Sequence, residues 1–351
     1  ARVRIPTTLN VGSLDLIHPG TVRADEEHPD LLTAGRALMD AYVAMGARAT
    51  FTCAPYQVDA RPGLGEHVAW AESNAIVFAN SVLGARTDRY GDFLDICAAI
   101  TGRAPRAGFH LDEARRAAFV IDVSAVAPHR WDDSAWYAVL GHLLGGLAGQ
   151  RVGAIVGLPS STNEDDLKAL GAAAASGGGV GLFHAVGVTP EAPTLAAVVA
   201  QGDPEVHVLT DADLVAARRG LCTADGSRID AISLGTPHAS LTEIRALAEE
   251  VERTATVVAA DVTAYVSTGR GVLALADAAD LVEPLKAAGF TFVVDTCTYL
   301  VPILPEGTRV VMTNSGKWAH YAPGNLGIDV VLGSLVECVA AAGAGRVALD
   351  V

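Results

Sequence analysis

The sequence predicts an α/β protein in which helices pack against mostly parallel sheets as α/β/α layers. Strand-like apolar runs alternate with Ala- and Leu-rich helical stretches, the links between them are short, and 50% of the 351 residues are hydrophobic. This alternation favours parallel strands joined by crossover helices. The chain is longer than one hydrophobic core usually supports, so we expect three subdomains, residues 1–128, 129–225 and 226–351.

The first predicted helix covers Leu31–Met45, where apolar residues recur at helical spacing and Gly46 follows in the usual terminating position. The later helices are predicted from the same kind of pattern, with a break near Pro284 in the last of them. They are Ser134–Ala148, Asn163–Ala175, a helix from Asp211, Leu241–Thr254 and a helix within Gly271–Ala288.

Short apolar runs between these helices are predicted to be strands. They are Arg48–Cys53, Ala117–Val123, Val152–Val156, Gly179–Ala185, Glu205–Leu209, Asp230–Leu234, Thr256–Val262, Thr291–Asp295 and Arg309–Thr313.

Composition excludes several classes of function. The formal net charge of −15 argues against nucleic acid as a partner, because binding a polyanion requires a basic face. A small anionic substrate needs only a few local cations or helix termini and stays open. No segment has the length of a membrane span, and the chain opens without the apolar core of a signal peptide, so we expect a cytoplasmic protein. Its five widely spaced cysteines do not predict a disulfide framework.

Two of these cysteines follow predicted strands. Cys53 ends one strand just before Pro55, and Cys297 follows Asp295 at the end of another. In open α/β sheets, sites gather beyond the carboxyl ends of the strands. Each cysteine alone is also explained as a small buried apolar residue. Two that converge on one crevice would favour a metal ion or cluster, since thiolates bind iron well.

Four other polar residues stand in similar places. Glu72 lies in apolar surroundings and has either a functional role or a structural ion pair. Arg86, near Gly84, could hold a carboxylate or simply be solvated. His238, after the strand Asp230–Leu234, could carry a proton or contact substrate, although a lone histidine is more often structural. Lys317, flanked by Gly316 and aromatic residues, could contact an anion or be an ordinary surface lysine.

The chain lacks the glycine-rich motifs of nicotinamide and nucleoside-triphosphate sites near its first strand, and it lacks a GxSxG elbow. Gly269–Ala274 is only a loose relative of the first of these motifs. Dehydrogenase, kinase and serine-hydrolase chemistry therefore have little support.

Several sequence blocks resemble the aconitase X family. They run in family order through nearly the whole chain: Thr52–Tyr56, Trp70–Ala75, Asn80–Thr87, Ile100–Arg103, Gly187–Glu191, Gly235–His238, Asp295–Cys297 and Lys317–Tyr321.

The resemblance implies an aconitase-like fold and a hydro-lyase that removes water from a small hydroxy acid with the help of an iron centre. Bacterial members dehydrate cis-3-hydroxy-L-proline to pyrroline-2-carboxylate, and archaeal members dehydrate a phosphorylated mevalonate. Thr52–Gln57 is more similar to the bacterial form. The alternatives are the large subunit of phosphomevalonate dehydratase and a non-catalytic binding or assembly subunit with the same fold.

The resemblance also implies roles for individual residues. Cys53 and Cys297 correspond to metal ligands. Where the archaeal branch has a third ligand cysteine, this chain has Thr236. Either Cys222 supplies the third thiolate of a 4Fe-4S cluster, or the centre is a 2Fe-2S cluster or a single iron.

The residues expected to contact substrate are Asn10, Ser73, Arg86, Lys317 and His320, and those expected to act in catalysis are Glu72, His238 and Lys317. In this scheme Lys317 and Arg86 hold the carboxylate, and Glu72 or His238 passes a proton to the departing hydroxyl. The family's small swivelling domain, which carries a catalytic serine, is not in this sequence. We expect it as a separate subunit or a fused segment.

Overall fold

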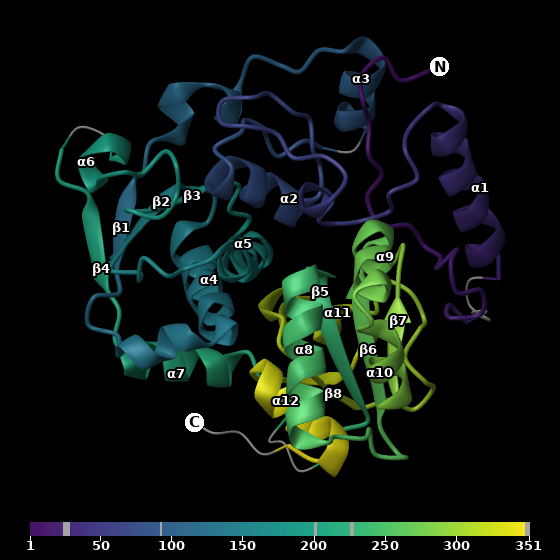
Figure 1. The fold of residues 1–351 in the computed structure, drawn as a ribbon. Helices are drawn as coiled ribbons and strands as arrows, with labels where there is room; N and C mark the ends of the chain where they lie inside the picture. Colours follow the sequence, from purple (N-terminus) through teal and green to yellow (C-terminus); the bar gives the residue numbers. More distant parts are fainter. Residues whose placement is uncertain (24–28, 92, 200–201, 225–227, 348–351) are drawn as a thin grey trace. The chain divides into compact units, whose positions relative to one another are not determined.

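The computed structural model describes residues 1–23, 29–91, 93–199, 202–224 and 228–347 (Figure 1). The chain forms two compact units. Unit 1 comprises residues 1–2, 6–60 and 221–351, and unit 2 comprises residues 3–5 and 61–220. The predicted boundary between residues 225 and 226 falls outside the described residues.

Unit 1 is built on a five-stranded sheet in the order β7-β6-β5-β8-β9, and all of its strand pairs are parallel. Its elements are α1 (Leu31–Ala44), β5 (Ala231–Ala239), α8 (Leu241–Thr254), β6 (Thr263–Thr268), α9 (Arg270–Ala278), α10 (Val282–Ala287), β7 (Phe290–Val293), β8 (Val310–Thr313), α11 (Gly316–Leu326), β9 (Asp329–Leu332) and α12 (Leu335–Ala344). The strand order reverses between β5 and β8, the kind of position at which open α/β sheets bind ligands.

The two faces of this sheet differ in character. One face joins α8, α9, α10 and α12 in a single apolar core, to which β5 contributes Ile232 and Leu234. Because strand side chains alternate between faces, Ser233 points the other way. There its hydroxyl lies 2.7 Å from that of Thr298, which also accepts a 2.9 Å hydrogen bond from the Trp318 indole of α11. This second face is therefore polar near the carboxyl ends of the strands.

Unit 2 is built on a four-stranded sheet in the order β3-β2-β1-β4, again with parallel pairs throughout. Its elements are α2 (Ser73–Val77), which continues as a π-helical turn (Phe78–Val82), α3 (Leu94–Thr101), β1 (Phe119–Asp122), α4 (Ser134–Ala148), β2 (Gly153–Val156), α5 (Glu164–Gly178), β3 (Phe183–Ala185), α6 (Leu195–Val198), β4 (Glu205–Val208) and α7 (Asp211–Gly220). Both sheets confirm the predicted α/β class with parallel strands.

Helices α4 and α5 approach each other through glycine. A Cβ atom on Gly141 would lie 2.1 Å from the carbonyl oxygen of Leu170, and one on Gly178 would lie 1.8 Å from that of Gly145. Real side chains cannot come so near to a backbone, so these glycines are required for the helices to pack at this distance.

We expect Gly141→Ala to destabilise unit 2 by about 1–3 kcal/mol, because the added methyl group forces the two helices apart. Gly146 offers a matched control in the same helix, since a Cβ there would meet no atom within 4 Å. Gly146→Ala should leave stability unchanged or raise it by up to about 1 kcal/mol. Chemical unfolding of both variants tests this, and equal midpoints for the two would contradict it.

Two predicted strands are wrong. In Arg48–Cys53 only Arg48 pairs, in an isolated bridge with Thr8, and the positive φ of 41° at Phe51 interrupts any ladder. Thr256–Val262 is also not a strand. The strand of this region, β6, covers Thr263–Thr268 and begins directly after the last residue of the predicted strand.

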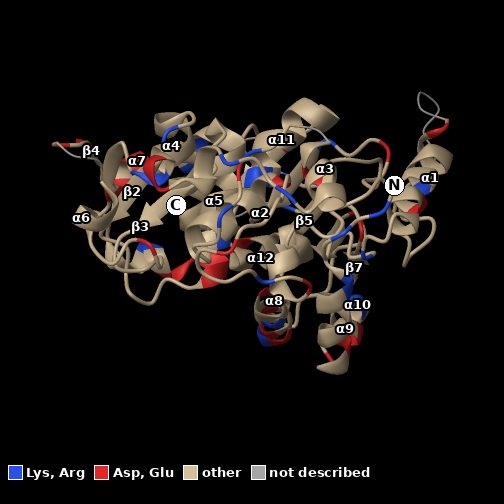
Figure 2. Ribbon diagram, turned by 90° about the horizontal axis from the view of Figure 1, so that it is seen from above, with Lys and Arg blue, Asp and Glu red and all other residues tan. Residues whose placement is uncertain are grey.

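Helix α8 carries charges of both signs. Figure 2 shows acidic and basic residues side by side along α8, which matches a solvated helix face rather than a basic binding surface. Among the described residues, no helix is both long and apolar enough to cross a membrane.

Candidate metal centre

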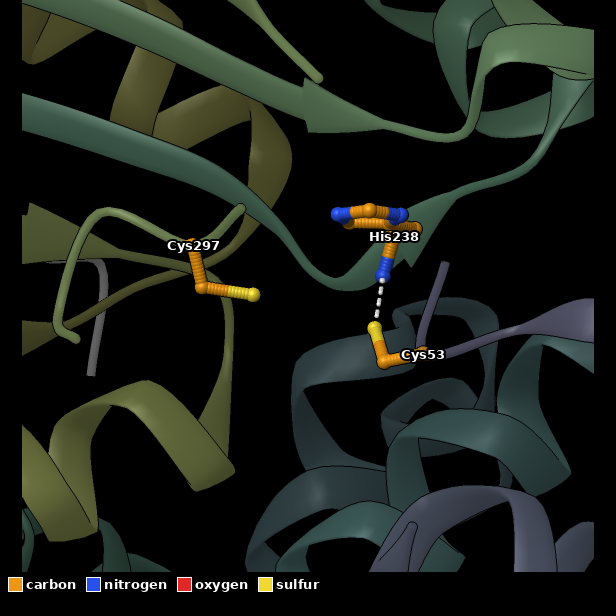
Figure 3. Close-up of side chains that lie close together, drawn as sticks. All are labelled: Cys53, His238 and Cys297. Atoms are coloured by element: carbon orange, nitrogen blue, oxygen red, sulfur yellow. Dashed lines mark hydrogen bonds between the residues drawn. The ribbon is translucent and has the colours of Figure 1, made fainter. Parts of the chain in front are cut away.

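Three buried side chains of unit 1 converge at the carboxyl end of its sheet. The ligand atoms of Cys53, His238 and Cys297 all lie within 4.8 Å of one another. Figure 3 shows the sulfur of Cys297 directed toward the other two residues and the backbone N–H of His238 directed at Cys53. The structure therefore brings together the two cysteines that the sequence singled out and adds a histidine to them.

Cys53 is held by the segment around it. The Thr52 N–H donates to the carbonyl of Leu9 at 3.0 Å, and a 3-10 turn begins at Pro55. The His238 N–H donates to Cys53 Sγ at 3.2 Å. Cysteine binds metals as the thiolate, and this contact lies within the metal-ligand group.

His238 lies at the carboxyl end of β5, where the Ser240–Glu243 capping box begins α8 and fixes the direction of the chain. Its ring contacts Thr52 Oγ1 through Nδ1 at 3.0 Å and the carbonyl oxygen of Thr296 through Nε2 at 3.2 Å. A carbonyl only accepts, so Nε2 is the donor in the contact with Thr296. Histidines that bind metals commonly donate their other nitrogen to a backbone carbonyl in this way.

Cys297 follows β7 in a segment that is tied down on several sides. Asp295, with a φ of 64°, accepts hydrogen bonds from Arg270 at 2.5 and 2.7 Å and from the Leu16 N–H at 3.1 Å. These bonds raise the pKa of Arg270, which stays charged. Asp15 also accepts a hydrogen bond from the backbone N–H of Val294 at 3.0 Å.

The residues present fit a metal centre. Two sulfurs and one imidazole nitrogen form a soft donor set that suits iron as well as zinc. Within the described part of the chain, Thr236, Ser267 and Thr296 each have a buried hydroxyl without a hydrogen-bond partner. Thr236 and Thr296 are close in sequence to His238 and Cys297. A buried polar group without a partner costs about 1–3 kcal/mol, which is consistent with a further group at this place.

Lys317 is buried in the first turn of α11, after β8. Two neighbours anchor that turn. The Ser315 hydroxyl donates to the carbonyl oxygen of Thr236, and the Trp318 indole donates to Thr298 at 2.9 Å. Thr236 is two residues before His238, and Thr298 directly follows Cys297. These two hydrogen bonds therefore join the turn that contains Lys317 to the chain segments of two metal-ligand residues.

Two other predicted substrate contacts belong to unit 1. Asn10 is exposed in the segment where the Leu9 carbonyl accepts from Thr52 and the Gly12 N–H donates to the Asp295 carbonyl at 2.6 Å. That segment joins the two cysteine-bearing stretches. His320 is exposed on α11 and packs edge-on against Tyr321, with 5.1 Å between the ring centroids.

The structure does not bring Cys222 to this group. Its sulfur accepts a hydrogen bond from the Leu332 N–H at 3.3 Å, and its side chain packs against the apolar core of unit 1. The metal-ligand group identified among the described residues comprises Cys53, His238 and Cys297. A third thiolate from Cys222 therefore gains no support.

The remaining predicted site residues belong to unit 2. Glu72 caps α2, where its carboxylate accepts from the Ala75 N–H at 2.8 Å and from the Ser73 hydroxyl at 3.3 Å. Arg86 donates to the carbonyl of His110 at 3.0 Å and pairs with Asp112. Both side chains are thus engaged locally, within the unit that contains them.

Arg86 lines a pocket of about 540 Å³ in unit 2 together with His67 and His110. The two Nδ1 atoms of these histidines are 2.7 Å apart, and Tyr90 contacts the other nitrogen of His110. Burial, followed by the neighbouring His67, lowers the pKa of His110. Burial, followed by the charge of Asp88, raises the pKa of Tyr90 to about 12. Sequence reasoning did not find this cluster, because its members are far apart in the chain.

The comparisons with known proteins agree with this fold. Residues 1–113 match the family model named aconitase X first domain, residues 117–219 match the second domain and residues 229–344 match the third. The chain belongs to the aconitase X family. The resemblance found in the sequence blocks is therefore confirmed.

The chain is similar to enzymes of two names. The chain is 44% identical over 99% of its length to cis-3-hydroxy-L-proline dehydratase of Pseudomonas aeruginosa. It is 42% identical over 97% of its length to that of Hypocrea jecorina. It is also 39% identical over 94% of its length to the large subunit of phosphomevalonate dehydratase of Methanothermobacter thermautotrophicus.

Coverage of these relatives differs between the groups. The chain spans 59% and 57% of the two cis-3-hydroxy-L-proline dehydratases but 79% of the archaeal large subunit. Among solved structures, aconitase X of Thermococcus kodakaraensis in its holo-form superposes with a TM-score of 0.84 at 32% identity, covering 97% of this chain and 82% of that one.

Proposed function

We propose that this aconitase X chain is the metal-binding catalytic part of a hydro-lyase that converts cis-3-hydroxy-L-proline to pyrroline-2-carboxylate. The observation that carries the proposal is the buried Cys53–His238–Cys297 group at the carboxyl end of the sheet. The higher identity to the named cis-3-hydroxy-L-proline dehydratases supports this substrate over a phosphorylated mevalonate.

The centre is an iron site, either a 2Fe-2S cluster or a single iron, held by Cys53, His238 and Cys297. When bound, it supplies Lewis acidity toward a hydroxyl or carboxylate oxygen. A 4Fe-4S cluster would call for a third thiolate, and the group found among the described residues offers two thiolates and an imidazole, which supports the smaller centres. The position of the His238 ring beside the two sulfurs supports a role as metal ligand in preference to the proton transfer expected from the sequence.

Lys317 binds the carboxylate of the substrate. Lys317 is buried in the first turn of α11, where its positive charge adds to the positive end of the helix dipole, and both favour an anion. Asn10 and His320 supply hydrogen bonds from the same unit. The contributions of Glu72, Ser73 and Arg86 stay predictions from the family resemblance.

The reaction breaks the bond between Cα and its hydrogen and the bond between C3 and its hydroxyl oxygen. The electron pair from Cα forms the new double bond, and the hydroxyl leaves as water after it gains a proton. The resulting enamine takes up a proton at C3, loses the proton on its ring nitrogen and becomes the cyclic imine. The base at Cα is a serine of the small swivelling domain, which acts as a partner of this chain.

The full-length protein, with its small domain or subunit, tests the proposal. Incubation with cis-3-hydroxy-L-proline should yield pyrroline-2-carboxylate, detected by mass spectrometry as loss of one water, and the protein should contain iron. Turnover of a phosphorylated mevalonate in a parallel reaction would favour the archaeal activity instead. A colourless, iron-free protein that turns over neither compound would indicate a binding or assembly subunit and would reject the proposal.

A further inference from the structure

One arginine contacts the segments of both cysteines. Arg270, the first residue of α9, binds the carboxylate of Asp295 through two nitrogens, at 2.5 and 2.7 Å. Its guanidinium also lies over the ring of Phe51, 5.1 Å from the ring centre. Phe51 and Asp295 each stand two residues before a cysteine of the metal-ligand group.

The two residues that Arg270 contacts both have unfavourable backbone conformations. Phe51 and Asp295 have φ values of 41° and 64°, in the left-handed region that residues other than glycine rarely adopt. Such a conformation costs on the order of 1 kcal/mol and persists only when surrounding contacts impose it. A bidentate ion pair with a fully buried carboxylate and a stacked guanidinium are contacts of this kind.

Gly269, the residue before Arg270, lies close to Thr52 and His238. A Cβ atom on Gly269 would lie 3.2 Å from Thr52 Oγ1 and 3.9 Å from Nδ1 of His238. The turn between β6 and α9 thus touches the segments of all three ligand residues. Glycine at position 269 leaves room for the hydrogen bond between Thr52 and His238.

We infer that Arg270 is a positioning residue that sets the distance and orientation between Cys53 and Cys297 by holding Phe51 and Asp295 in their left-handed conformations. Its contacts in the structure are with Asp295 and Phe51, and it acts through them. The inference rests on the proposed function only in that the Cys53–His238–Cys297 group binds metal.

The test uses Co²⁺ as the probe, added to the metal-free full chain. Thiolate-to-cobalt charge transfer reports sulfur coordination, and the visible d–d bands report its geometry. Arg270→Lys keeps the charge beside Asp295 but loses the bidentate fork and the flat stacking surface. Phe51→Leu removes the stacking partner and leaves the ion pair intact.

We expect both variants to bind Co²⁺ about tenfold more weakly, with shifted d–d bands, because outer partners of metal ligands contribute about 10- to 100-fold to affinity. Arg253→Lys is the matched control. Arg253 pairs with Glu250 through two nitrogens at 2.8 and 2.6 Å, but on the exposed surface of α8 in the same unit. It should bind Co²⁺ with unchanged affinity and spectrum.

Wild-type affinity and spectrum in folded Arg270→Lys would overturn the inference. If circular dichroism shows that this variant does not fold, Phe51→Leu decides in the same way. A wild-type chain without thiolate-to-cobalt charge transfer would also overturn it. If the wild type binds Co²⁺ through sulfur and the two variants bind it more weakly, but the full-length protein does not dehydrate cis-3-hydroxy-L-proline, the proposed substrate fails and the role of Arg270 stands.

Discussion

Replacing Cys297 by serine should abolish visible absorption by iron and lower dehydration by more than about 100-fold, since even the outer partners of metal ligands contribute about 10- to 100-fold. The hydroxyl of serine is a poor iron ligand compared with a thiolate. Cys297 is buried beside His238 and Cys53, so the substitution leaves the centre one sulfur ligand short. Iron analysis, the absorption spectrum and the initial rate of dehydration measure the effect.

Two other cysteines serve as controls for this substitution. Cys338 is buried in the core of unit 1 on α12, and Cys97 is exposed on α3. Cys338→Ser should lower stability, because it buries a hydroxyl among apolar side chains, but should keep iron and activity per folded molecule. Cys97→Ser should leave stability, iron content and activity unchanged. Full turnover with normal iron content in Cys297→Ser would remove Cys297 from the centre.

Replacing Lys317 by methionine should separate substrate binding from the metal. We expect kcat/KM for cis-3-hydroxy-L-proline to fall by about 100-fold, the usual contribution of one preorganised donor to a developing negative charge. The iron content and absorption spectrum should stay as in the wild type, because the metal ligands are untouched. Methionine is apolar and similar in length, so it suits the buried position of Lys317.

Lys286→Met is the matched control for this prediction. Lys286 lies on α10 of the same unit and pairs with Glu283 at 2.9 Å on the exposed surface. This variant should retain the wild-type kcat/KM. An unchanged kcat/KM in folded Lys317→Met would show that another group binds the carboxylate. Loss of iron from that variant would instead indicate that Lys317 supports the centre.

The sequence predicted the alternating architecture but not every strand. Two apolar runs stand on either side of Asp261, Val257–Ala260 and Ala264–Val266, and both look like strands. Only the second pairs with β5 and β7, for example Ala264 with Ile232. The choice is made by long-range pairing, which local pattern does not encode.

Because this strand was misplaced, the sequence also did not indicate a role for Arg270. With the strand ending at Val262, Gly269–Arg270 did not stand at a strand end and was noted only as part of a weak glycine motif. Cys53 and Cys297 were found because their position after apolar runs and the family blocks agreed. The contact between Arg270 and Phe51 joins residues far apart in the chain, and no spacing rule predicts it.

The hydrogen bond between His238 and Cys53 joins residues that are 185 positions apart. Ribosomes add about 5–20 residues per second, so Cys53 emerges on the order of 10 s or more before its partner. Throughout that interval its thiol has no completed site and is open to oxidation or to capture by other metals. Iron must therefore be delivered after synthesis of the sheet is finished, which makes the yield of active protein depend on the iron supply and the redox state of the expressing cell.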